Sequence, residues 1–167
     1  MIDKRWKGAF ELLGLVAIVA SLIFVGMEIQ QERDLARSDL AAQSFENTST
    51  LHLTLSNPDF ARTYAKALER PNDLTIDEKL QVNGYLRAYL ALIRRECYLT
   101  ERDVFSECRG IVQGTGPIVF GNRYAQAWWQ LNKPEVGPYF PEWIDSAITS
   151  FDPDTHLQML KEVSVDH

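Results

Sequence analysis

An uncharged apolar run close to the N-terminus constrains this chain more than any other feature. Residues 12–27 (LLGLVAIVASLIFVGM) contain no charged residue and one polar residue, Ser21. As a helix the run rises ~24 Å, and extending it back to Gly8 brings its length to the ~30 Å thickness of a hydrocarbon core. A soluble core helix in a small domain is rarely apolar on every face. The run therefore predicts a transmembrane anchor within residues 1–30 and an extramembrane domain over residues 31–167.

The residues that flank this run favour a retained signal anchor with its N-terminus in the cytoplasm. Val25–Ile29 lacks the small-x-small pattern that a signal peptidase cleaves. Three basic residues lie at positions 4–7, whereas only Arg33 and Arg37 follow the run closely. Because basic residues accumulate on the cytoplasmic side of a membrane, we expect a single-pass protein of the inner membrane. Its C-terminal domain would lie in the periplasm if the source is a Gram-negative bacterium.

The charge balance argues against binding to nucleic acid. Of the 17 Lys+Arg and 23 Asp+Glu in the chain, three basic and two acidic residues precede or enter the span, so the residues after Met27 carry a net charge of −7. Contacts to phosphates need a basic face, and an acidic domain is not attracted to anionic lipid. We therefore expect partners among other membrane-protein chains and the lipid bilayer, and no nucleic acid.

The remaining sequence predicts helices throughout. No Gly or Pro occurs between Met27 and Asn57, which indicates that the membrane helix continues as a stalk, although residues 50–55 alternate like a strand. Asn57 before Pro58 predicts a helix start. Thr75 and Glu78 have the spacing of a capping box, which opens a long helix to about Leu99. Its apolar stripe predicts the centre of a bundle; the stripe consists of Val82, Leu86, Tyr89, Ile93 and Cys97, widened by Tyr85, Leu92 and Leu99.

The C-terminal third predicts shorter helices and one break. We expect a helix from Asp103 to about Gln113, a turn at Gly114–Pro117, and helices over residues 123–131, 141–150 and 153–163. The predicted fold class is thus all-α: an N-terminal transmembrane helix that continues into a stalk, followed by a small helical bundle.

Several stretches resemble a group of uncharacterised bacterial proteins with one N-terminal membrane helix and an acidic all-helical domain of unknown function. The stretches are LGLVAIVASLIFVGMEIQQERDLARSDLAAQ, Asn57–Phe60, Arg95–Tyr98 and Tyr124–Trp129, which together span nearly the whole chain. At Gly114–Pro117 this chain departs from that group, whose members tend to continue a helix there. The resemblance implies this architecture and no catalytic residues.

Three positions or sets of positions stand out as candidate sites. Gly14, Ala17 and Ser21 form a small-residue face on which another membrane helix could pack. Glu96 falls on the apolar face of the long helix, so it is either a proton- or ligand-binding carboxylate with a raised pKa or the acid of a buried ion pair with Arg62 or Arg123. Cys97 and Cys108 flank an expected turn at similar distances, so they face each other either as a disulfide or as two buried thiols.

No catalytic or metal-binding motif accompanies these residues. His52, His156 and His167 are scattered, and the chain has no nucleophile elbow, phosphate loop or zinc-type Cys/His spacing. We therefore expect no cofactor, no metal and no enzymatic activity. The sequence favours a membrane-anchored structural or interaction protein, as a homo-oligomer or an accessory subunit of a larger membrane complex. One alternative is an extracytoplasmic helical sensor that binds a ligand and signals through a partner. The other is an enzyme that uses Glu96 as its general acid or base.

Overall fold

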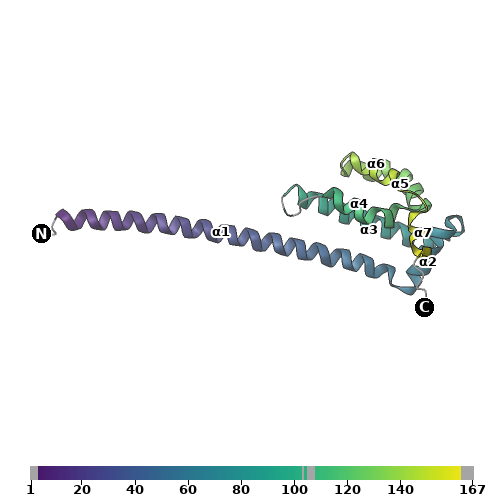
Figure 1. Cartoon of the computed structure of the whole chain (residues 1–167), viewed down its shortest axis with the longest axis horizontal. Helices are drawn as coiled ribbons and strands as arrows, with labels where there is room; N and C mark the ends of the chain where they lie inside the picture. Colours follow the sequence, from purple (N-terminus) through teal and green to yellow (C-terminus); the bar gives the residue numbers. More distant parts are fainter. Residues whose placement is uncertain (1–3, 103, 105–107, 163–167) are drawn as a thin grey trace. The chain divides into compact units, whose positions relative to one another are not determined.

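A computed structural model describes residues 4–102, 104 and 108–162, and in this part of the chain the fold is all-α, as predicted. The helices are α1 (Lys4–Leu55), α2 (Pro58–Glu69), α3 (Ile76–Thr100), α4 (Cys108–Phe120), α5 (Arg123–Val136), α6 (Trp143–Ser150) and α7 (Thr155–Glu162), with short 3-10 turns η1 (Pro71–Asp73) and η2 (Gly137–Tyr139) (Figure 1). No strand occurs among the described residues.

The chain forms two compact units, Met1–Ala42 and Gln43–His167. Helix α1 makes up the described part of the first unit, and its last residues, from Gln43 on, belong to the second. Residues 50–55, whose apolar residues alternate as in a strand, are helical, as the predicted continuation of the membrane helix requires. In the second unit Leu51 and Leu55 pack against the core of the bundle.

The predicted starts of α2 and α3 are confirmed in atomic detail. The Asn57 side chain accepts hydrogen bonds from the backbone N–H groups of Asp59 (2.9 Å) and Phe60 (3.3 Å). The Thr75 hydroxyl accepts from Glu78 N (3.3 Å), and the Glu78 carboxylate accepts from Thr75 N (2.7 Å). These bonds satisfy backbone donors that have no partner inside a helix.

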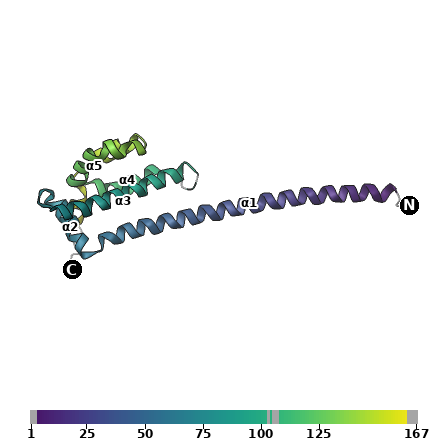
Figure 2. The same cartoon turned by 180° about the vertical axis from the view of Figure 1, so that it is seen from behind.

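Helix α3 is the central element of the bundle. Its predicted stripe is buried except for Leu92, which is half-buried, and Leu90 joins it. α3 packs against α2 and α4, and it runs beside α4 in both views of the fold (Figures 1 and 2). Aromatic rings fill the space between the helices, beginning with Tyr64 and Tyr85, whose ring centres lie 5.5 Å apart. Apolar burial around one central helix thus holds the domain together.

The predicted break at Gly114–Pro117 is wrong, because α4 continues through Pro117 to Phe120. Packing explains the difference: α4 contacts α3, α5, α6 and α7, and a Cβ atom at Gly116 would lie 2.6 Å from the Phe151 ring. Gly116 therefore lets Phe151 approach the helix closely. The predicted helix start at Asp103 lies outside the described residues.

The last three helices lie where the sequence placed them, with different ends. Helix α5 runs five residues further than expected and includes Pro134. Helix α6 begins at Trp143 rather than Pro141. Helix α7 begins at Thr155 rather than Pro153. Just before it, the Asp152 side chain accepts a hydrogen bond from Asp154 N (2.9 Å).

Candidate functional site

The three small residues of the predicted membrane face lie on exposed surface of α1. Gly14, Ala17 and Ser21 occur at i, i+3 and i+7, so their side chains share one side of the helix. The Ser21 hydroxyl donates to the Ala17 carbonyl (2.9 Å). Because the hydroxyl proton is already donated within its own helix, this face offers another helix close packing and, at Ser21 Oγ, a hydrogen-bond acceptor only.

Glu96 is buried, but not in the ion pair that the sequence suggested. Glu96 is 4% exposed, and its Oε1 has no hydrogen-bond partner in the part of the chain that the structure describes. Arg62 instead pairs with Asp59, and Arg123 pairs with Asp154 (3.0 Å). Burial raises the pKa of the Glu96 carboxyl above its ordinary value, and the positive charge of Arg95 opposes that shift.

The structure brings Cys97 and Cys108 together in a disulfide that links α3 to α4. Their Cα atoms lie 4.8 Å apart, within the range that a disulfide requires. Glu96 precedes Cys97 in the chain, so the buried carboxyl and the bridge share the C-terminal end of α3.

One hollow of the second unit combines basic and aromatic side chains, and we call it the arginine groove. It has a volume of about 500 Å³ and lies between one face of α3 and the segment where α5 passes into η2. On α3 its residues recur every three or four positions, which places them along one side of the helix. The lining residues are Arg87, Leu90, Ala91, Arg94, Arg95, Tyr98, Val136, Tyr139 and Phe140.

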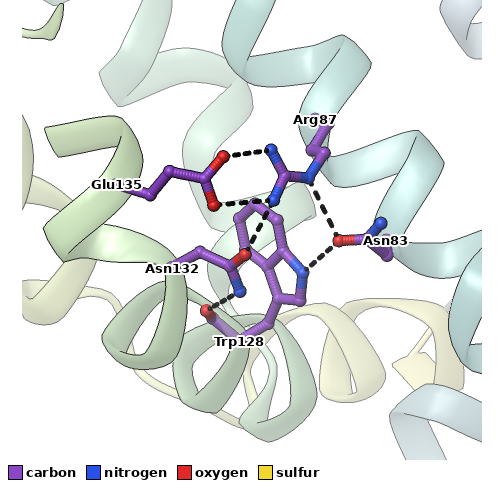
Figure 3. Close-up of polar contacts among 5 residues, drawn as sticks. All are labelled: Asn83, Arg87, Trp128, Asn132 and Glu135. Atoms are coloured by element: carbon purple, nitrogen blue, oxygen red, sulfur yellow. Dashed lines mark hydrogen bonds and ion pairs between the residues drawn. The ribbon is translucent and has the colours of Figure 1, made fainter.

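A polar network holds Arg87 at this groove (Figure 3). Its guanidinium donates to both carboxylate oxygens of Glu135 (3.3 and 3.2 Å) and to Asn132 Oδ1 (3.1 Å). Asn83 Oδ1, the side-chain amide oxygen, accepts hydrogen bonds from Trp128 Nε1 (2.8 Å) and from Arg87 Nε (3.4 Å). The network joins α3 to α5 and neutralises the charge of Arg87, so we assign Arg87 a structural role.

The other two arginines of the groove have different surroundings. The Arg94 guanidinium lies over the Tyr139 ring, 4.7 Å from its centre, and pairs with no carboxylate among the described residues. Arg95 donates to Gln43 Oε1 (2.9 Å). Beside them, Arg102 lies over the Tyr98 ring at 4.8 Å. Stacking on an aromatic face fixes a guanidinium while keeping its charge.

No sequence motif singles out this groove. The spacing of Arg87, Arg94 and Tyr98 shows that they share a face of one helix. Tyr139 and Phe140 come from a segment more than 40 positions later, and only the packing of the bundle places them opposite α3. No cluster of His, Cys, Asp and Glu suited to a metal ion occurs among the residues that the structure describes.

Comparisons with known proteins add no relative to this description. No family model matches the chain, and neither the curated proteins nor the solved structures contain a significant match.

Proposed function

We propose that this protein is a single-pass membrane protein whose helical domain acts by associating with other membrane-protein chains, either copies of itself or a larger complex. The observation that carries the proposal is the exposure of α1. The large apolar residues from Leu12 to Met27 are 48–69% exposed, and the helix is long and apolar enough to cross a membrane. A continuous apolar surface of this kind needs lipid or protein around it.

The flanking charges support the orientation within this proposal. More basic residues precede the span than follow it closely, which favours a cytoplasmic N-terminus in the inner membrane. The acidic domain would then lie on the extracytoplasmic side, where a disulfide between Cys97 and Cys108 can persist.

Membrane insertion is tested by a matched pair of substitutions in α1. Leu22 and Leu53 are 68% and 67% exposed, but only Leu22 lies in the apolar run. A carboxylate near the centre of a spanning helix costs about 3 kcal/mol, so Leu22→Asp should release the protein from membranes washed with alkaline carbonate. Leu53→Asp should leave it in the membrane fraction. Equal retention of both variants would contradict the anchor.

Association is tested on the small-residue face. Replacing Gly14, Ala17 and Ser21 together with Leu should shift the protein to a smaller assembly in mild detergent, because bulky side chains keep helices apart. The control replaces Val16, Val19 and Ile23 with Leu, at the same spacing on the opposite side of the helix. Light scattering, corrected for bound detergent, gives the mass of each assembly and so shows whether this face mediates association. An unchanged mass in the first variant would mean that this face contacts lipid.

A further inference from the structure

The arginine groove is positively charged, although the chain as a whole is acidic. Three of its nine lining residues are arginines and none is acidic, while the chain carries a net charge of −6. Glu135 neutralises Arg87 from beside the groove. The charge of Arg94 has no such partner among the described residues. An anion in the groove would therefore meet an uncompensated guanidinium.

The position of Arg94 suits a carboxylate in particular. Its guanidinium carbon lies over the Tyr139 ring, 4.7 Å from the ring centre, and a guanidinium carries its N–H groups in its own plane. A planar edge with parallel N–H groups can donate to both oxygens of one carboxylate. Stacking also limits the motion of the side chain, so less conformational entropy is lost when a ligand binds.

Apolar residues form the rest of the groove. Leu90 is buried at its base, and Val136 and Phe140 are half-buried along one wall. A volume of about 500 Å³ is within the range of small-molecule sites. A ligand that fills it needs an apolar body in addition to its charged group.

Other hollows of the domain lack this combination. The larger one beside η1 is lined by Arg70 and Arg123, but Arg123 pairs with Asp154 (3.0 Å) and Arg70 lies 3.9 Å from Asp73. The charges of these two arginines are thus already balanced, and Lys79, which also lines that hollow, lies over no aromatic ring among the described residues. From these contrasts we propose that the arginine groove binds a small amphipathic carboxylate, with Arg94 holding the carboxylate and Leu90, Val136 and Phe140 contacting the apolar body.

This site goes beyond the association proposed above, and it would also serve a sensor that signals through a partner chain. The test uses the full chain in lipid nanodiscs and three probes: phenylbutyrate, the neutral phenylbutanol with the same body, and inorganic phosphate. Calorimetric titration should give a Kd of about 1 mM or lower for phenylbutyrate. The Kd of phenylbutanol and that of phosphate should each be at least about tenfold higher. Empty nanodiscs give the contribution of lipid, which is subtracted.

Two variants and one control locate the binding. Arg94→Gln should weaken phenylbutyrate binding about tenfold, since a charged hydrogen-bonded pair is lost. Ala91→Glu, on the exposed side of α3, should abolish it by placing a carboxylate in the groove. Arg109→Gln removes a guanidinium that lies over Trp143 at 5.1 Å, outside the groove, and should leave binding unchanged.

The proposal is overturned by any of three results. These are no heat of binding at about 10 mM phenylbutyrate, equal affinity for phenylbutanol, or equal losses in the Arg94 and Arg109 variants. Thermal unfolding of each variant shows whether the domain is still folded. None of these results depends on the assembly mass or on carbonate extraction, so the site and the association can fail separately.

Discussion

The buried carboxyl of Glu96 makes the stability of the domain depend on pH. Burial raises its pKa in the folded state, so between the unfolded and folded pKa values the folded protein keeps a proton that the unfolded chain has lost. The stabilisation from this proton is complete below the unfolded pKa and disappears as the pH rises through the folded pKa. Above the folded pKa the charged form is left buried, and its Oε1 has no hydrogen-bond partner among the described residues, which destabilises the fold.

At pH 8 the free energy of unfolding of Glu96→Gln, measured in urea, should therefore exceed that of the wild type by about 1 kcal/mol. At pH 5 the difference should be smaller. Tryptophan fluorescence of the detergent-solubilised protein measures both transitions. Glu101→Gln, at the exposed C-cap of the same helix, is the control and should leave both values unchanged. A difference between Glu96→Gln and wild type that is equal at both pH values would contradict this account.

The burial of Glu96 could be predicted because it depends only on spacing along one helix. Glu96 lies three and seven positions after Ile93 and Tyr89, which are both buried. Its partner could not be predicted in the same way. The positions of Arg62 and Arg123 depend on how α2 and α5 pack, and in the folded protein they pair with Asp59 and Asp154 instead.

At the scale of the helix, α4 shows why Gly and Pro residues led to the wrong prediction of a turn at Gly114–Pro117. Gly and Pro within four positions normally predict a break, and Pro117 does remove one backbone donor. Burial of Val112, Val119 and Phe120 on one side of α4 outweighs that loss. The starts of α2 and α3 could be predicted because capping involves residues that are adjacent in sequence.

Two glycines of α4 should respond oppositely to the same substitution. At Gly116 a Cβ atom would lie 2.6 Å from Phe151 Cε2 and Cζ, whereas at Gly114 it would meet nothing within 4 Å. Gly116→Ala should lower the free energy of unfolding by about 1–2 kcal/mol through overpacking. Gly114→Ala should raise it by about 0.5–1 kcal/mol through helix propensity.

Urea unfolding of the two alanine variants, measured side by side, checks both signs. The wild type and the Gly114 variant serve as references for the Gly116 variant. A Gly116→Ala protein as stable as wild type would mean that the Phe151 ring moves aside without cost.

At the scale of the whole molecule, the cysteines report which side of the membrane holds the domain. If the domain is extracytoplasmic, the Cys97–Cys108 disulfide should be intact in cells. Protein alkylated in denaturant without reductant should then show no reactive thiol, and two thiols after reduction. Two reactive thiols before reduction would contradict both the bridge and the proposed orientation.

The all-α class could be predicted for the whole chain because apolar periodicity and caps are local properties. The arginine groove could not, because its two walls meet only through the packing of α5 and η2 against α3. The elements are thus encoded locally, whereas the groove exists only once the bundle has formed.

The aromatic rings of the core also give the domain an optical signal of its own. Trp129 is 1% exposed, its ring centre lies 6.3 Å from that of Phe120 and 6.4 Å from that of Phe140, and its Nε1 donates to Asp145 Oδ1 (2.9 Å). An indole held in such a rigid, dry setting emits at short wavelength, resists collisional quenchers and gives near-ultraviolet circular dichroism. The folding of this domain can therefore be followed in a lipid or detergent sample without attaching a dye.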